Sequence, residues 1–155
     1  MMFPDFSLFM KEALQEAARG LEEGEVPVGA VVVDPAGSVV ARAHNQPISL
    51  NDPCAHAEIL ALRQAGIFYK NYRIGGATLV VTIEPCLMCI GAAMHARVAR
   101  LVFGAHDPKG GAAGSLYNVP EDLRLNHQIE VIPGVLEEEC RKLLQDFFRT
   151  RRDKE

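Results

Sequence analysis

The chain has 155 residues, of which 48% are hydrophobic and 23% charged, and its formal net charge is −4 at pH 7. This length fits one domain, spanning residues 1–155, with a sizeable buried core. The composition is that of an ordinary soluble globular protein. The negative charge argues against a surface covered with basic side chains for indiscriminate nucleic-acid binding, but it is compatible with a local basic patch.

The cysteine pattern favours metal or redox chemistry over a disulfide framework. The four cysteines are unevenly spaced, and two of them form a C-x-x-C motif. The first twenty residues are interrupted by Lys11, Glu12 and Glu16, so we expect no signal peptide. No apolar run is long enough to span a bilayer. We therefore expect a cytoplasmic protein that does not enter a membrane.

The first half of the chain predicts a helix, two strands and a second helix. Asp5 can cap a helix whose apolar stripe runs from Phe6 to Leu21. Residues 26–34 and 38–44 then have the composition of strands, joined by a turn at 34–37. A polar loop over 44–53 leads to a helix that we expect to begin near Cys54 or Ala55.

The second half predicts alternating strands and helices. Residues 77–83 form a short apolar run, typical of a strand buried on both faces, and Pro85 ends it. The remaining elements in chain order are a helix over 86–98, a strand over 99–105, a glycine-rich loop over 107–118, a strand over 129–133 and an amphipathic helix whose apolar positions run from 135 to 148. This order predicts an α/β protein with a mixed, mostly parallel five-stranded sheet and helices on both faces.

Two clusters of possible metal ligands lie where helices are expected to begin. His56 and Glu58 stand at the start of one helix, and Cys86 and Cys89 at the start of the next. Residues at i and i+3 lie on one face of a helix, and the free N–H groups of a first turn favour thiolate. Helix starts that follow neighbouring strands converge at one edge of a sheet.

One imidazole and two thiolates would bind a zinc ion and leave its fourth tetrahedral position for water. An open position is the mark of a catalytic rather than a structural zinc site. Glu58 would then be free to handle the protons of that water. The pattern H-x-E with P-C-x-x-C, present here as residues 56–58 and 85–89, is the signature of zinc nucleobase deaminases.

The chain resembles the bacterial tRNA-specific adenosine deaminases over nearly its whole length. The segments that carry the resemblance are "VPVGAVVV", "HNQPI", "DPCAHAEILALRQAG", "NYRI", "TLVVTIEPCLMC", "FGAHDPKGGAAGS", "LNH" and "DFFRTRR". The resemblance implies a single deaminase domain with the cytidine-deaminase-like α/β/α sandwich fold, one zinc ion per chain and a homodimer. It also implies the conversion of adenosine to inosine at the wobble position of a tRNA anticodon.

The resemblance also implies roles for individual residues. Asn45 would hydrogen-bond the target nucleoside, with Val28 and Asn126 helping to line the pocket. Asp107 would accept a hydrogen bond from a ribose 2′-hydroxyl, the group that distinguishes RNA from DNA. The remaining expected contacts to the anticodon stem-loop are Ala57, Lys109, Phe148, Arg149 and Arg152, the last two in a basic tail suited to phosphates.

The expected mechanism uses Glu58 as a proton shuttle. Zinc would lower the pKa of a bound water toward neutrality. Glu58 would accept a proton as hydroxide attacks C6, pass it to the purine ring nitrogen, and then protonate the departing amine so that ammonia leaves. Bases of an anticodon loop are already partly unstacked, so moving one into a pocket costs little.

Several alternatives stay open on the sequence alone. The C-x-x-C pair alone is compatible with a redox site, and Cys54 or His95 would close a structural zinc site as fourth ligand. A deaminase of free bases or nucleotides, of the guanine or cytosine type, would use the same motif. A noncatalytic RNA-binding module held by zinc is a further alternative, although it would have no need of Glu58. Independently of these alternatives, Asp107 and Lys109 are also compatible with a role only in shaping a turn, and the terminal arginines with a solvated helix end.

Overall fold

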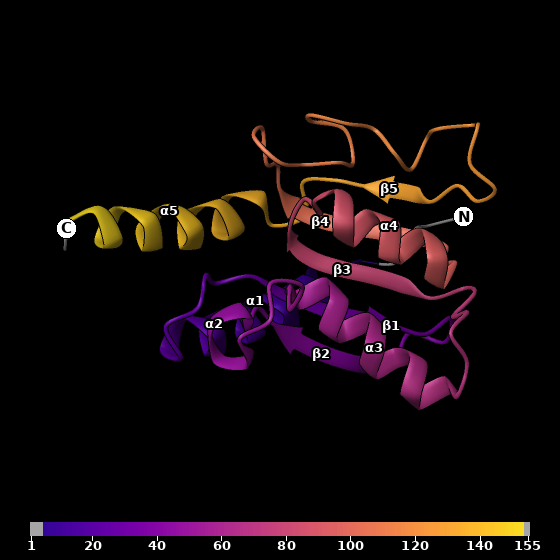
Figure 1. Cartoon of the computed structure of the whole chain (residues 1–155), viewed down its shortest axis with the longest axis horizontal. Helices are drawn as coiled ribbons and strands as arrows, with labels where there is room; N and C mark the ends of the chain where they lie inside the picture. The colour runs from indigo at the N-terminus through magenta and orange to yellow at the C-terminus, as the bar shows by residue number, and fades with distance from the viewer. Residues whose placement is uncertain (1–4, 154–155) are drawn as a thin grey trace.

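A five-stranded mixed sheet lies between two layers of helices in the computed structural model, which describes residues 5–153 (Figure 1). The sheet order is β2-β1-β3-β4-β5. The strands are β1 (Gly29–Val33), β2 (Val39–His44), β3 (Thr78–Ile83), β4 (Arg100–Ala105) and β5 (Glu130–Ile132). The predicted α/β fold with a five-stranded sheet is confirmed.

One strand, β1, runs against the direction of all the others. It pairs antiparallel with both β2 and β3, whereas β3 with β4 and β4 with β5 pair in parallel. The strands β2, β3, β4 and β5 therefore share one direction. The sheet is mostly parallel in strand direction, although only half of its pairings are parallel.

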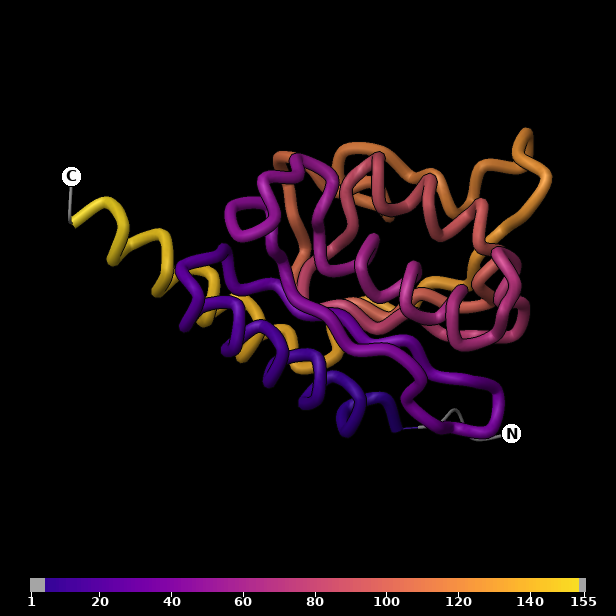
Figure 2. The backbone as a smooth tube through the Cα atoms, turned by 60° about the horizontal axis from the view of Figure 1, so that its bottom comes forward, coloured from indigo at the N-terminus to yellow at the C-terminus, as the bar shows by residue number. Residues whose placement is uncertain are grey.

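Helices cover both faces of the sheet (Figure 2). On one face lie α1 (Ser7–Glu22) and α5 (Glu137–Asp153), and on the other lie α3 (Ala57–Tyr69) and α4 (Leu87–Ala96). Side chains alternate along β1, so that Ala30 and Val32 join the core cluster of α3 and α4, while Val31 and Val33 join that of α1 and α5. This alternation explains why β1, which is covered on both faces, is apolar and buried along its whole length.

The predicted boundaries differ from the structure mainly ahead of α3. This helix begins at Ala57 rather than at Cys54 or Ala55, because a turn precedes it in which Asp52 Oδ1 accepts a hydrogen bond from the Cys54 N–H at 2.9 Å. The polar loop over 44–53 contains a short helix, α2 (Pro47–Leu50), that was not expected. The N-cap residue of α1 is Phe6 rather than Asp5, although the Asp5 carboxylate accepts a hydrogen bond from the Ser7 N–H at 3.0 Å.

His44, at the end of β2, bridges two carboxylates of α1. Its Nδ1 lies 2.9 Å from Glu16 and its Nε2 lies 2.9 Å from Glu23. Burial favours the neutral imidazole, but the hydrogen bonds to Glu16 and Glu23 outweigh it and raise the pKa of His44 above 6.5. The charged imidazole therefore ties α1 to β2.

We expect this contact to make stability depend on pH. The folded state holds the His44 proton more tightly than the unfolded state, so the stabilisation is complete below about pH 6.5 and is lost as the pH rises through the raised pKa. The free-energy difference between wild type and His44→Gln, measured by urea unfolding, should be on the order of 1 kcal/mol larger at pH 6 than at pH 9. His95→Gln, at an exposed position, is the control. Equal differences at both pH values would contradict the prediction.

None of the helices formed by residues 5–153 combines the length and the apolar character that crossing a membrane requires.

Candidate metal centre and active site

One edge of the sheet collects the functional segments of the chain. Asn45 follows β2, Glu84 follows β3 and Asp107 comes soon after β4, so all three lie beyond carboxyl ends of strands that share one direction. Val28 precedes β1, and because β1 runs the opposite way, its amino end lies at the same edge. The predicted convergence at one sheet edge is confirmed, but the strands ahead of α3 and α4, β2 and β3, are not neighbours as expected, because β1 lies between them.

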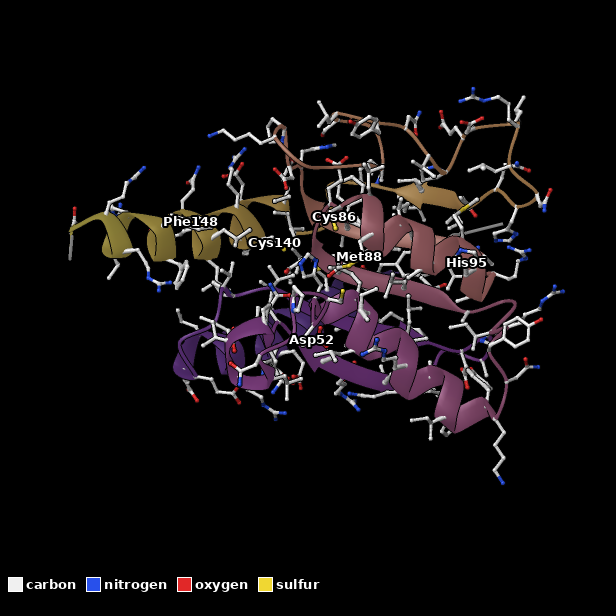
Figure 3. The ribbon with its side chains drawn as sticks, in the orientation of Figure 1. Asp52, Cys86, Met88, His95, Cys140 and Phe148 are labelled. Atoms are coloured by element: carbon white, nitrogen blue, oxygen red, sulfur yellow. The ribbon has the colours of Figure 1, made fainter. Side chains whose placement is uncertain are left out.

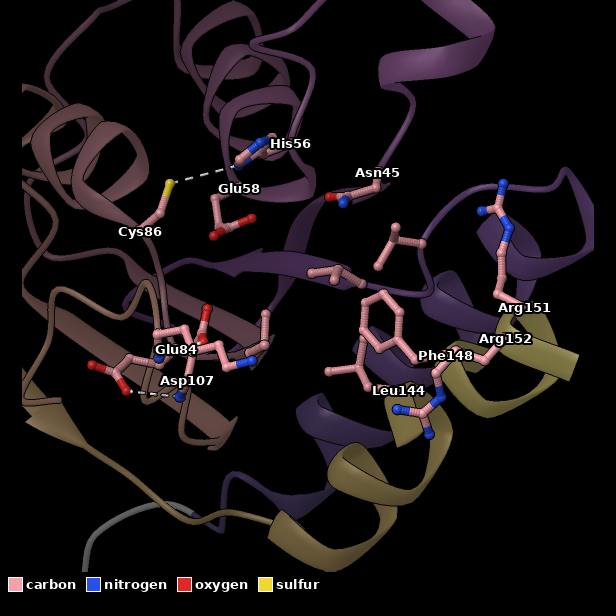
Figure 4. A pocket seen from close by; sticks show the side chains of 14 residues that line it. Asn45, His56, Glu58, Glu84, Cys86, Asp107, Leu144, Phe148, Arg151 and Arg152 are labelled. Atoms are coloured by element: carbon pink, nitrogen blue, oxygen red, sulfur yellow. Dashed lines mark hydrogen bonds between the residues drawn. The ribbon is translucent and has the colours of Figure 1, made fainter. Parts of the chain in front are cut away.

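His56, Cys86 and Cys89 come together at this edge. His56 and Cys86 are the residues immediately ahead of α3 and α4, and both have extended backbone angles. The His56 Nδ1 lies 3.7 Å from Cys86 Sγ (Figure 4). It lies 3.4 Å from Cys89 Sγ. All three donor atoms lie within 4.8 Å of one another. One nitrogen and two sulfur donors at this spacing fit a zinc ion and leave one tetrahedral position open.

The hydrogen bonds among His56, Cys86 and Cys89 favour a thiolate, which is the form of cysteine that binds a metal ion. The pKa of Cys86 is lowered to about 3, because its thiolate accepts hydrogen bonds from the Cys89 thiol and from His56. The pKa of Cys89 is raised by its hydrogen bond to Cys86 and by burial. Cys86 therefore supplies a thiolate at neutral pH, and metal binding displaces the proton of Cys89.

Glu58 lies in the first turn of α3, and its side chain is 3% exposed. Burial raises the pKa of this carboxyl because it disfavours the charged form. A carboxyl whose pKa has moved toward neutrality can both take up and release a proton under ordinary conditions. Glu58 also lines the cavity that contains His56 and Cys86.

A cavity of about 840 Å³ opens in front of these side chains (Figure 4). This volume lies within the range of small-molecule sites. Six of the residues expected to contact substrate line it, namely Val28, Asn45, Asp107, Lys109, Phe148 and Arg152. The cavity is also lined by residues that were not expected from the sequence, namely Val26, Ile83, Glu84, Leu144 and Arg151.

Three expected contacts lie elsewhere. Ala57 is fully buried and does not line the cavity, and its N–H donates to Asn45 Oδ1 at 2.8 Å. Arg149 lines a neighbouring groove and pairs with Asp146 at 2.8 Å. Asn126 is exposed and does not line the cavity. It lies ahead of β5, and because β5 is parallel to β4, this segment approaches the sheet from the edge opposite the site.

The closed metal sites that the sequence left open do not form. Within residues 5–153, the group of possible metal ligands contains neither Cys54 nor His95. Cys54 is exposed, and His95 lies near the far end of α4 from Cys86 (Figure 3). The three-donor site therefore keeps its open position.

Glu84, which the sequence analysis passed over, is a second buried carboxylate at the same edge. It is 1% exposed. Burial opposes its ionisation, but hydrogen bonds from Ser115 and from the backbone N–H groups of Asp107, Ser115 and Ala113 outweigh this and lower its pKa. Glu84 is therefore ionised at neutral pH, whereas burial pushes Glu58 toward the protonated form.

The comparisons with known proteins agree with this geometry. Residues 5–105 match the family model of the cytidine and deoxycytidylate deaminase zinc-binding region. The chain is 51% identical over 147 residues to a tRNA-specific adenosine deaminase of Bacillus subtilis, with 95% of this chain and 91% of the relative covered. It is 49% identical over 144 residues to a tRNA-specific adenosine deaminase of Haemophilus influenzae, with 93% and 83% covered.

A solved structure has the same fold. It comes from a study of A-to-I editing by tRNA:A34 deaminases at the wobble position, and it superposes with a TM-score of 0.85 at 43% identity, covering 89% of this chain and 99% of that one. The family match, the relatives and the common fold agree with the three-donor site and its buried carboxyl. The chain belongs to the zinc-dependent cytidine and deoxycytidylate deaminase family, among its tRNA-specific adenosine deaminases.

Proposed function

We propose that the chain, as one deaminase domain, hydrolyses adenosine to inosine at the wobble position of a tRNA anticodon in the cytoplasm. The observation that carries this proposal is the placement of the three-donor site and Glu58 in one cavity whose rim carries Lys109, Arg151 and Arg152. A closed pocket for a free base would not need these cations, whereas an RNA backbone does. The names of the relatives support the same substrate.

The chemistry needs a nucleophile, an acid and a base. Zinc bound by His56, Cys86 and Cys89 would lower the pKa of water and so supply a nucleophile near neutral pH. Glu58 takes the proton released as the water oxygen attacks C6 and delivers it to the adjacent ring nitrogen. Glu58 then takes the proton of the new C6 hydroxyl and passes it to the exocyclic amine, so that the C6 carbonyl forms as the C6–N bond breaks and ammonia leaves. Burial raises the pKa of Glu58, which favours its uptake of a proton from the water.

Asn45 is held ready to orient the nucleoside. Its side-chain oxygen is occupied by the Ala57 N–H, which leaves the amide N–H groups of Asn45 as donors on a side chain that lines the cavity. Val28 lines the cavity beside it and offers an apolar surface to a base. Ala57 thus acts through Asn45 rather than by contacting substrate.

The end of α5 supplies the RNA contacts. Phe148 is 49% exposed on the cavity wall, where a base can stack against its ring. Arg151 and Arg152 lie beside it, and these cations are local, consistent with an acidic chain overall. Lys154 and Glu155 of the expected basic tail lie outside the described residues.

A homodimer is also proposed. Exposed apolar side chains lie on three segments next to the site, namely Ile48 and Leu50 of α2, Leu87 of α4, and Leu116 and Tyr117 after the glycine-rich loop. Burying such side chains against a second copy would remove apolar surface from water. Sedimentation equilibrium should give twice the chain mass, and a monomer at micromolar concentration would contradict this.

The test of the function is sequencing of the wobble position after incubation of tRNA with the zinc-loaded protein. Adenosine at that position should be read as guanosine, because inosine pairs like guanosine. Guanine, cytosine and free adenosine, assayed for ammonia release, distinguish a deaminase of small molecules. Release from a free base without any change in tRNA would overturn the proposal.

Arg152→Gln should weaken binding of an anticodon stem-loop and lower its salt dependence. Loss of one phosphate contact reduces the slope of log affinity against log salt by about one. Arg124→Gln is the matched control, because Arg124 makes the same charge change but is 89% exposed in an ion pair with Asp122. If the slope of log affinity against log salt is equal for both variants, Arg152 makes no phosphate contact and is only a solvated residue at a helix end.

Asp107→Asn should reduce discrimination against DNA. The Oδ1 of Asp107 accepts hydrogen bonds from the Lys109 and Gly110 N–H groups, each at 3.2 Å, so the side chain does shape its turn. Asparagine keeps an oxygen for this turn but lacks the negative charge. In the wild type, a charged carboxylate would accept a hydrogen bond from a ribose 2′-hydroxyl; on DNA it would have no such donor and would face only the backbone phosphates, which repel it. The ratio of kcat/KM on an RNA stem-loop to that on its deoxy counterpart should fall. If this ratio is unchanged, Asp107 does not recognise the ribose and serves only to shape its turn.

A further inference from the structure

Glu84 gathers four hydrogen bonds from a single loop. Its Oε1 accepts from the Asp107 N–H at 3.0 Å and from the Ser115 hydroxyl, and its Oε2 accepts from the N–H groups of Ala113 and Ser115, each at 3.0 Å. The donors lie 23 to 31 residues along the chain from Glu84. One buried carboxylate therefore joins the turn after β3 to the loop after β4.

The loop is shaped to fit this carboxylate. A Cβ at Gly111 would overlap the Glu84 carboxyl group, so only glycine lets the backbone pass so close. The Ala112 N–H also donates to the Pro85 carbonyl at 2.8 Å, beside Glu84. The segment 106–115 is thus hydrogen-bonded at several points to Glu84 and Pro85, the two residues immediately ahead of Cys86.

The same loop carries two of the side chains that face the cavity. Asp107 and Lys109 both line it, and the Asp107 N–H is itself one of the groups that Glu84 holds. The carboxylate of Glu84 has its acceptor sites filled by the loop, so it is not free to exchange a proton with substrate as Glu58 is. Glu84 therefore fixes the position of the loop relative to the metal centre and takes no part in proton transfer.

We propose that Glu84 is a positioning residue for RNA binding. It holds the loop 106–115 so that Asp107 and Lys109 face the substrate, and it thereby sets the KM for RNA more than kcat. This inference rests on the proposed tRNA substrate.

Glu84→Gln separates this role from simple filling of space. Glutamine has nearly the same shape, but one of its two terminal groups is an N–H donor. Placed at Oε1, that group meets the Asp107 N–H; placed at Oε2, it meets the N–H groups of Ala113 and Ser115. Either orientation leaves at least one buried backbone donor without an acceptor.

The experiment compares the zinc-loaded wild type, Glu84→Gln and Ser115→Ala. The expected result for Glu84→Gln is an unchanged zinc content, a KM for an anticodon stem-loop raised about tenfold, and a kcat within about threefold of wild type. Amide hydrogen exchange in residues 106–115 should be about tenfold faster. Ser115→Ala loses only the hydroxyl bond and keeps the N–H bond, so its KM should rise less, by about threefold.

The outcomes divide clearly. A fall in kcat or in zinc content at unchanged KM would overturn the proposal, because Glu84 would then serve the metal centre. Unchanged exchange in residues 106–115 would overturn it as well. If Glu84→Gln fails to fold, Ser115→Ala decides, and an unchanged KM in that variant contradicts the proposal. If the wild type itself leaves tRNA unmodified, the proposed function fails separately. Faster amide exchange in residues 106–115 of Glu84→Gln would then still support the positioning of this loop by Glu84.

Discussion

Glu58→Gln should keep the fold and the zinc ion yet lose deamination by a factor of about 10²–10⁴ or more, because Glu58 acts in more than one proton transfer. The amide of glutamine can neither take a proton from the attacking water nor return one to the leaving amine. The size and shape of the side chain are retained, so the buried position in the first turn of α3 should still be filled. Single-turnover rates on an anticodon stem-loop, with metal content measured on the same sample, check this.

The control for Glu58→Gln is Glu22→Gln, an identical change at an exposed position at the end of α1. It should deaminate at the wild-type rate. If Glu58→Gln also retained a rate close to wild type, the proton shuttle would have to be another group, and the mechanism proposed here would be wrong.

Cys86→Ala should remove most of the zinc and abolish activity with it. The variant loses the sulfur whose pKa is already lowered to about 3, and the two remaining donors, His56 and Cys89, cannot hold the ion tightly. Metal analysis after dialysis against a weak chelator should give far less than one zinc per chain, and the melting temperature should fall.

Cys54→Ala is the matched change for Cys86→Ala. Cys54 lies ahead of α3 as Cys86 lies ahead of α4, and both are free cysteines, but Cys54 is exposed and is not part of the three-donor group. Its zinc content and activity should equal those of wild type. Loss of metal from Cys54→Ala, with retention in Cys86→Ala, would reverse the ligand assignment.

The sequence was most informative where a structural signal is local. A strand followed by a helix start is visible in a few residues, and the two such junctions that carry His56 and Cys86 do meet in space. The stripe of α5 is also local: Leu144, Phe148 and Arg152 are spaced by four and line the cavity. Residues three or seven positions apart share this helix face as well, so the pattern also points to Arg151, which follows Phe148 by three residues and Leu144 by seven. Arg149 directly follows Phe148 and therefore points to another side of the helix.

What the sequence could not predict depends on groups far apart in the chain. Glu84 has the appearance of an ordinary polar residue after a strand, because its partners come 23 to 31 residues later. Asn126 was placed in the pocket by resemblance, but its location follows from the direction of β5 in the sheet. The Asp52 turn that delays α3 to Ala57 is likewise a matter of one hydrogen bond that competes with helix formation.

Because β1 runs opposite to the other strands, the turn between β1 and β2 lies at the sheet edge opposite the cavity. This turn spans residues 34–37, and Pro35, Ala36 and Gly37 are exposed. Exposed turns of this kind accept inserted chain with little cost to the fold. A fluorescent label, a surface tether or a second protein domain inserted between Ala36 and Gly37 would therefore lie away from the cavity. The protein can then be labelled, immobilised or fused at this turn with its pocket left open.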